Sequence, residues 1–203
     1  MSPAKPASRL TQAEYLALER AAEFKSEFFD GEIFAMAGGT RWHSLIALNL
    51  AAEFRRRIKG GKCVPYNADL RVKVEATGLL TYPDLTVACG KQRFLDADVD
   101  TLLNPTLIAE VLTDSTEAYD RGKKFEHYRQ IPSLREYLLV SQREPRIEQF
   151  FKDRNGQWFL SEAAGLRTSL PLPSLGIALV LSKVFAQVKF APTRIRPLTR
   201  THS

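Results

Sequence analysis

The alternation of hydrophobic and polar positions divides the chain into helical and extended segments. Apolar residues at helical spacing predict a helix over residues 42–58, and the arginines and glycines at its end are typical of a helix C-terminus. Residues 70–74 alternate as a half-exposed strand does. Residues 82–88 and 107–112 are almost continuously apolar, which is typical of strands buried on both faces. The pattern therefore predicts helices packed on a central sheet.

Capping and turn signals predict the shorter elements. Thr11 followed by Glu14 predicts a capping box that opens a helix through about Ala22. The pair Asp30-Gly31 between apolar residues predicts a β-hairpin. The remaining predictions are a helix over 117–130, strands over 136–140, 147–151 and 158–160, a surface loop over 89–105, and a last short helix over 179–188.

The order of these elements indicates the fold class. Helix, hairpin, helix, several strands, helix and further strands favour an α/β or α+β domain, with a mixed sheet flanked by helices. A chain of 203 residues is long enough for one domain with a sizeable core. We expect a flexible N-terminal arm over 1–10, a single domain over 11–190 and a basic, disordered tail over 191–203.

The positive charge is concentrated at the two ends of the chain. The formal net charge is +6, and the ends carry five cations and no acid, which leaves +1 for the body: Lys5, Arg9, Arg194, Arg196 and Arg200. Such ends can touch nucleic acid but are more often solvated arms. The near-neutral body argues against tight, sequence-independent DNA binding, because that affinity comes largely from phosphate neutralisation.

Hydropathy and cysteine spacing bear on location and redox chemistry. The apolar runs are far shorter than the ~20 residues of a membrane span, and the N-terminus lacks the apolar core of a signal peptide. We therefore expect no membrane contact and a cytoplasmic location. Cys63 and Cys89 are far apart in sequence and predict neither a zinc site nor a redox pair. Cys89 is expected to be a small buried residue.

Two carboxylates interrupt the apolar strands. Asp84 follows Pro83 near the start of one strand, and Glu110 lies in the middle of another. Because an unpaired buried charge is costly, each acid needs a partner or a function. If the two strands pair, the carboxylates converge. Together with the backbone carbonyl of Val111 they would offer the oxygen ligands that Mg²⁺ prefers.

The following helix adds a lysine to this picture. Asp120, Lys124 and Tyr128 recur every four residues and therefore share one helical face. Lys124 would orient or deprotonate an attacking water and offset transition-state charge.

Each of these residues also has a purely structural interpretation. Asp84 can cap a turn, and Glu110 can form a buried ion pair with Lys124 or Arg121. Asp120 and Lys124 can form an ordinary helix salt bridge, and Tyr128 can belong to the core. Only the combination, in this order, points to phosphodiester chemistry.

The combination also resembles a known family. The matching segments are Tyr82-Pro83-Asp84, residues 104–112, Ser115-Thr116, the Asp120, Lys124 and Tyr128 spacing, residues 27–32, His43 and residues 134–140. Together they resemble the Uma-two family, described as restriction endonuclease domains of the PD-(D/E)XK nuclease superfamily. The resemblance covers residues 10–151 well and the remainder loosely.

The resemblance implies a restriction-endonuclease-like fold and Mg²⁺-dependent hydrolysis of DNA phosphodiesters, with Mn²⁺ as a substitute ion. It makes Asp84 and Glu110 the metal ligands and Lys124 the catalytic lysine, with Lys123 as the weaker candidate. Glu27 would be a further acidic ligand, although alone it is a plain hairpin residue. His43 is interpreted as a hydrogen-bonded structural residue rather than a catalyst.

The chain departs from the family and superfamily patterns at two positions. The superfamily places its lysine two residues after the acid, where this chain has Leu112. Asp114 stands where the family usually has a proline. The first departure shifts the catalytic lysine to the helix, and the second changes a turn or adds an acid near the site.

Three functions are consistent with these residues. The first is a metal-dependent DNA endonuclease, acting as a homodimer so that two sites reach two strands. The second is a catalytically silent nuclease-fold module that binds nucleic acid or a protein. The third is a hydrolase of another phosphate ester. Intact Asp84, Glu110 and Lys124 favour the first and third over the second.

Overall fold

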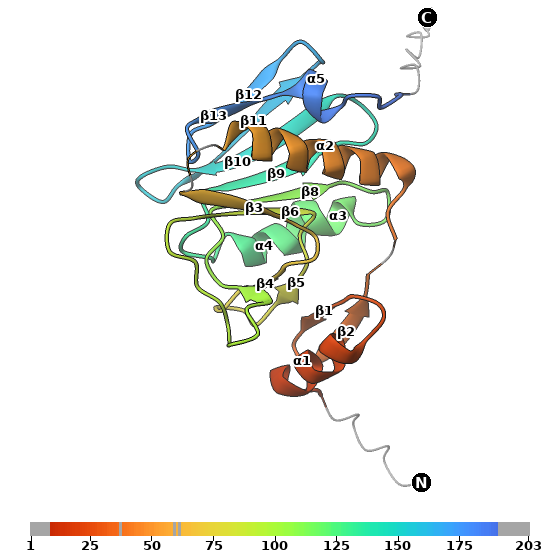
Figure 1. The fold of residues 1–203 in the computed structure, drawn as a ribbon, viewed down its shortest axis with the longest axis vertical. Coiled ribbons are helices and arrows are strands. Elements are labelled where there is room, and N and C mark those ends of the chain that lie inside the picture. The colour runs from red at the N-terminus through yellow and green to blue at the C-terminus, as the bar shows by residue number, and fades with distance from the viewer. Residues whose placement is uncertain (1–8, 37, 59, 61, 191–203) are drawn as a thin grey trace, which may run out of the picture.

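A mixed six-stranded sheet forms the centre of the computed structural model, which describes residues 9–190 apart from 37, 59 and 61 (Figure 1). The parallel pair β8–β9 is joined by the helical segment that follows β8, and the other neighbours are antiparallel. The strand order is β11 (Trp158–Ala164), β10 (Arg146–Lys152), β9 (Glu136–Val140), β8 (Leu107–Val111), β6 (Leu85–Cys89) and β3 (Cys63–Asn67).

Helices cover both faces of this sheet. On one face lies α2 (Arg41–Arg57), beside the hairpin of β12 (Ser169–Leu172) and β13 (Ile177–Val180) and the short helix α5 (Leu181–Val184). The helical segment on the other face comprises α3 (Glu117–Tyr119), a π-helical turn (Asp120–Lys124) and α4 (Phe125–Tyr128). The predicted mixed sheet flanked by helices is thus confirmed.

A second, smaller sheet carries the N-terminal elements. Its order is β2 (Glu32–Ala35), β1 (Ser26–Phe29), β5 (Leu80–Thr81), β4 (Arg71–Lys73) and β7 (Thr101–Leu102). The helix α1 (Gln12–Ala21) packs on β1, where the Tyr15 and Phe28 rings stack with centroids 4.8 Å apart. Figure 1 shows α1 and the β1–β2 hairpin at one end of the molecule, away from α5.

Ion pairs attach α1 to the loop before β7. Arg20 contacts three carboxylates at 2.8 Å each, those of Asp96, Asp98 and Asp100. Asp100 also pairs with the buried Arg71 of β4. These guanidinium groups hold the pKa of Asp100 well below its usual range, with Arg20 contributing most. The contacts fix the N-terminal helix against the β4–β7 end of the second sheet.

Side-chain alternation along β8 decides which layer each residue meets. Ala109 and Val111 pack in the cluster under α2, whereas Ile108 and Leu112 pack in the cluster under α4. Glu110 has the same parity as Ile108 and Leu112, so it faces α4. Glu110 therefore points to the face opposite Ala109 and Val111.

Most predicted elements are confirmed. Thr11 and Glu14 form the capping box of α1, and Asp30 and Gly31 turn the hairpin with φ of 50° and 81°, as such turns require. The predicted helix over 42–58 corresponds to α2. The predicted strands correspond to β4, β6, β8, β9, β10 and β11. Residues 1–8 and 191–203, to which most of the predicted arm and the predicted tail belong, lie outside the described residues.

Three predictions of secondary structure were partly wrong. In the segment 179–188, residues 179–180 belong to strand β13, because Leu179 pairs with Leu170 across a hairpin, and only Leu181–Val184 form the short helix α5. The loop over 89–105 contains β7, which pairs in parallel with β4. The helix over 117–130 is interrupted by the π turn. The first two differences arise from strand pairing, which periodicity does not reveal.

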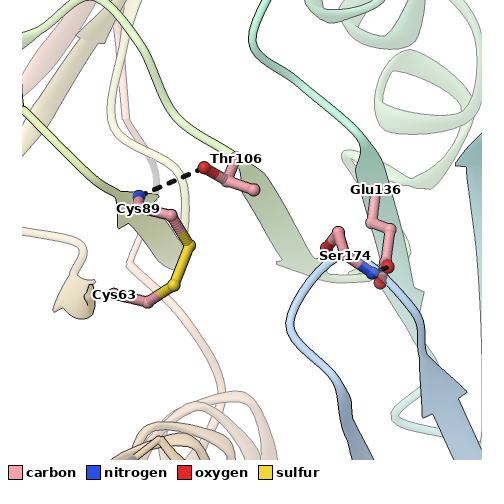
Figure 2. Close-up of a disulfide and its surroundings, with 5 residues drawn as sticks. All are labelled: Cys63, Cys89, Thr106, Glu136 and Ser174. Atoms are coloured by element: carbon pink, nitrogen blue, oxygen red, sulfur yellow. Dashed lines mark hydrogen bonds between the residues drawn. A yellow bond between two sulfur atoms is a disulfide. The ribbon is translucent and has the colours of Figure 1, made fainter. Parts of the chain in front are cut away.

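The prediction that the two cysteines form no redox pair was wrong. Cys63 and Cys89 are cross-strand partners in the antiparallel β3–β6 pair and form a disulfide (Figure 2). The backbone N–H of Cys89 also donates to Thr106 Oγ1 at 3.1 Å. Strand β3 contains Pro65 and lacks clear alternation, so it was not recognised as a strand. Without it, nothing brought the two cysteines together.

Figure 2 also shows Glu136, another buried acid, on β9. It accepts a hydrogen bond from the Ser174 N–H at 2.7 Å and another from Gln149 Nε2. These bonds anchor the turn between β12 and β13 to the central sheet. In the described ranges, no helix combines the length and apolarity needed to cross a membrane.

We predict that the disulfide stabilises the fold through the edge strand β3. Closing a loop of 26 residues restricts the unfolded chain, which is worth about 3 kcal/mol. A reductant should therefore lower the free energy of unfolding by about that amount in urea titrations followed by circular dichroism. The double variant Cys63→Ala/Cys89→Ala should be equally destabilised and insensitive to reductant. A wild-type protein indifferent to reductant would contradict the prediction.

Candidate active site

The ammonium group of Lys124 lies at the centre of a cluster of carboxylates. Its Nζ is 3.0 Å from Glu27 Oε1, 3.0 Å from Glu110 Oε1 and 3.6 Å from Asp120 Oδ1. The carboxylates come from the hairpin, the central sheet and the π turn, which are distant in sequence. The Lys124 side chain is only 7% exposed, so the ion pairs form in a poorly solvated environment.

Glu110 joins this lysine to the sheet. Its Oε1 also accepts a hydrogen bond from the Tyr128 hydroxyl at 2.8 Å, and its Oε2 accepts one from the Asp84 N–H at 3.2 Å. Burial raises the pKa of Glu110, and the Asp120 and Asp84 carboxylates add to this effect although Lys124 opposes it. The mid-strand acid therefore has the partners that its burial requires.

Asp84 lies immediately before β6, beside Glu110 on the neighbouring strand. Its Oδ2 accepts hydrogen bonds from the Val111 N–H at 2.8 Å and faces His43 Nε2 at 3.0 Å. Within the described residues, no hydrogen bond reaches Asp84 Oδ1. Pairing of β6 with β8 thus brings the two predicted carboxylates together.

His43 reaches Asp84 from the first turn of α2. Thr40 caps this helix by accepting from the His43 N–H at 3.1 Å. A Cβ atom at Gly39 would lie 2.6 Å from His43 Nδ1, so only glycine leaves room for the ring there. The hydrogen bond to Asp84 raises the pKa of His43, which favours the charged imidazolium. His43 thus lies within the cluster, where it holds one oxygen of Asp84.

Glu27 comes from β1 of the N-terminal hairpin. Its Oε1 accepts from the Thr81 hydroxyl as well as from Lys124. Because β1 pairs with β5 through Phe28 and Leu80, the side chains of Glu27 and Thr81 meet beside the lysine. The hairpin therefore supplies a wall of the site.

The π turn positions Asp120 and Lys124. Both are buried, and the Tyr137 hydroxyl donates to the Asp120 carbonyl at 3.0 Å. This bond from β9 satisfies a carbonyl where the helical hydrogen-bond pattern changes. Burial raises the pKa of Asp120. It would lower the pKa of Lys124, but the attraction of Glu110 and Glu27 outweighs burial and raises it well above the usual value. Single π turns are frequent at functional sites.

The cluster opens into a cleft of about 1130 Å³ between the β1–β2 hairpin, the N-terminal end of α2, the α3–α4 segment and the β9–β10 turn. Eight carboxylates and five Lys or Arg side chains line it, which leaves a formal charge of −3. Within the described residues, no group of three or more His, Cys, Asp or Glu side chains is placed to hold a metal ion unaided.

Two residues predicted from the sequence, Lys123 and Val111, lie outside the centre of the carboxylate cluster. Lys123 is 74% exposed and pairs with Glu126 at 3.4 Å, so it lies on the surface of the cleft and not among the buried carboxylates. Val111 contributes its backbone. The N–H of the next residue, Leu112, donates to the Val140 carbonyl on β9. Because successive residues of a strand direct their backbone groups to opposite neighbours, the backbone groups of Val111 face β6 and Asp84. The structure thus brings together Asp84, Glu110, Lys124, Glu27, His43, Asp120 and Tyr128, with Val111 at the edge of the cluster.

Comparison with protein families places this geometry in context. A family model described as "Putative restriction endonuclease" (Uma2) matches residues 12–182. The chain belongs to the Uma2 family. This confirms the resemblance inferred from the sequence motifs.

Similar proteins extend the comparison. Two proteins of Synechocystis sp., both described as uncharacterized, resemble this Uma2 chain over most of their length. The first, slr1290, is 37% identical over 93% of this chain and 98% of its own length. The second, sll1609, is 38% identical over 77% of this chain and 88% of its own length.

A solved structure shares the fold. The crystal structure of "a putative nuclease belonging to DUF820" from Anabaena variabilis has a TM-score of 0.69 and covers 85% of this Uma2 chain and 96% of that chain, with 18% sequence identity. At this identity the likeness shows the fold. It confirms the predicted restriction-endonuclease-like architecture.

Sequence reasoning missed three residues that shape the site of this Uma2 protein. Thr81 binds Glu27, Tyr137 binds the π turn, and the Tyr119 ring lies 5.9 Å from Lys124 Nζ. The position of Tyr119 next to Asp120 was the one available signal. Thr81 and Tyr137 lie in apolar strands, and their contacts depend on neighbours that local sequence does not identify.

We predict that Lys124 is required to offset the buried carboxylates. Lys124→Met should lower the free energy of unfolding by about 3 kcal/mol, because it leaves buried charges without a partner. The double variant Lys124→Met/Glu110→Gln should cost less than Lys124→Met alone, since it also removes a charge. Urea unfolding of the four proteins of this cycle measures the coupling.

The matched control is Lys123→Met, which removes an exposed lysine one residue away. It should change the free energy of unfolding by no more than about 0.5 kcal/mol. Strictly additive effects of the Lys124 and Glu110 substitutions would show that the two groups are not coupled.

Proposed function

We propose that this protein is a Mg²⁺-dependent nuclease that hydrolyses DNA phosphodiester bonds. The observation that carries the proposal is the contact of Lys124 with Glu110, beside Asp84, at the base of a cleft with excess negative charge. Membership of a family described as "Putative restriction endonuclease" supports the nuclease class. The metal, the DNA substrate and the role of each residue are parts of the proposal.

The donor set fits a hard divalent cation. Mg²⁺ is usually held by one or two carboxylates, with water and substrate phosphates completing its oxygen ligands. Asp84 and Glu110 would hold it, with the Val111 carbonyl as a further ligand. The formal charge of −3 in the cleft favours cation binding before a polyanion approaches. Bound there, the ion would activate water and neutralise charge on the phosphate.

The chain's own residues then have separable roles. Lys124 has a pKa well above its usual value, so it stays charged at neutral pH and serves as an electrostatic stabiliser rather than a proton acceptor. Tyr128 and the Asp84 N–H hold the two oxygens of Glu110 in place. His43 and the Val111 N–H both bind Asp84 Oδ2, so neither of these two contacts involves Asp84 Oδ1.

The two alternative functions make different demands on the same groups. A catalytically silent module would keep the carboxylates only for the Lys124 ion pairs. A hydrolase of another phosphate ester would use the same site on a different substrate. A homodimer belongs to the proposal only for duplex cleavage, since one site cuts one strand at a time.

We predict nicking of supercoiled plasmid DNA that requires Mg²⁺ or Mn²⁺ and stops when a chelator is added. Asp84→Asn, Glu110→Gln and Lys124→Met should each reduce the rate at least about a hundredfold, the usual scale for losing a catalytic electrostatic contact. Lys123→Met should cleave like the wild type. Equal nicking by wild type and Asp84→Asn would identify a contaminating nuclease and refute the assignment.

We also predict that Mn²⁺ binds without DNA, in a manner measurable by calorimetry. The Asp84→Asn/Glu110→Gln variant should lose this binding, because two of the anionic ligands are neutralised. Asp114→Asn, which removes an exposed carboxylate of the same cleft, should retain it. Binding that survives the double substitution would move the metal elsewhere and favour the silent-module function.

A further inference from the structure

The reacting groups of the cleft lie beneath a rim of aromatic and apolar side chains. Glu110 and Lys124 are 4% and 6% exposed, whereas Phe34, Met36 and Tyr119 are 48%, 37% and 38% exposed and line the same cleft. These exposed side chains therefore offer apolar surface along the cleft that leads to the lysine. This arrangement places contact area for bases, rather than for a phosphate backbone, at the entrance.

The cations of the rim are already engaged with carboxylates. Arg121 pairs with Glu117 and Glu148, and Arg143 pairs with Asp114. The remaining pairs are Arg146 with Glu162 and Lys123 with Glu126. Affinity for a rigid duplex comes largely from cations that neutralise its phosphates. With each rim cation paired, the described part of the cleft offers a duplex little such gain.

Tyr119 is an exposed aromatic residue of the cleft that also contacts Lys124. Its ring centre lies 5.9 Å from Lys124 Nζ. Burial, followed by the charges of the surrounding carboxylates, raises the pKa of its hydroxyl to about 12, so the ring stays neutral. The same nucleotide could therefore place its base on Tyr119 and its phosphate near Lys124.

Stacking distinguishes paired from unpaired bases. Inside a duplex both faces of a base are covered by its neighbours, so a side chain stacks on it only if the base leaves the helix or the base step opens. An unpaired base exposes a face, and stacking on an aromatic side chain is a sequence-tolerant source of affinity for single strands.

We propose that the preferred substrate is single-stranded or locally unpaired DNA, with one base stacked on Tyr119 and the adjoining phosphate directed to Lys124. The inference rests on the proposed nuclease function and names the substrate class of that same site. A paired duplex is then cut only where its bases open. Tyr119 selects the substrate, whereas the carboxylates and Lys124 act on it.

Fluorescence anisotropy with three labelled DNAs of one sequence tests the preference. The probes are the single strand, its blunt duplex and the same duplex with a central unpaired loop, all with Ca²⁺ as the divalent ion. The single strand and the looped duplex should bind at least about tenfold more tightly than the blunt duplex. With Mn²⁺, cleavage should follow the same order and fall within the loop.

Three variants test the role of Tyr119. Tyr119→Ala should weaken binding of the single strand about tenfold, the scale of losing one stacked base, and should leave weak duplex binding unchanged. Tyr119→Phe keeps the ring and should bind like the wild type. Phe159→Ala removes an aromatic residue that is 52% exposed on β11, outside the cleft, and should change nothing.

Each outcome separates this inference from the proposed function. Asp84-dependent cleavage of the blunt duplex at the rate of the single strand would overturn the substrate preference and leave the nuclease function intact. Wild-type binding by Tyr119→Ala would overturn the stacking role in the same way. Failure to cleave any of the three DNAs would overturn both.

Discussion

Three carboxylates converge on the ammonium group of Lys124, and the burial of these charges constrains the rest of the molecule. Each carboxylate comes from a different layer, so the hairpin, the sheet and the helix are joined at one nitrogen atom. A buried charge tolerates little displacement of its partners, because a lost contact is not replaced by water. The same constraint that holds the layers in register therefore holds the reacting groups in place.

Much of this arrangement could be predicted from the sequence because the decisive residues contradict their surroundings. Glu110 interrupts an apolar strand, and burial of an acid demands a partner. Lys124 shares a helical face with Asp120 and Tyr128, which pointed to the partner. Helix α2 was predicted from its repeating apolar face, and strand β8 from a continuous apolar run, because burial of one face or of both leaves these two patterns.

The remainder depends on which distant segments meet. Glu27 and His43 look ordinary in their local sequence, and their roles arise from pairing of β1 with β5 and from the approach of α2 to Asp84. The disulfide was missed because β3 carries a proline and no alternation. Local sequence also gave no sign of the charge of the cleft. The body of the chain is nearly neutral, but the carboxylates that line the cleft outnumber its cations.

The π turn makes the site sensitive to chain length rather than to composition. In a regular α-helix each residue advances the side chain by about 100°, so positions four apart drift steadily around the axis. The wider turn over Asp120–Lys124 changes that advance just before α4. A side chain at Gly122 would meet nothing within 4 Å, so that position has room for other residues. Deleting it, however, would rotate Asp120 relative to Lys124 and Tyr128, because these two residues both follow Gly122. Substitutions can vary this segment, but its residue count is fixed by the geometry of the carboxylate cluster.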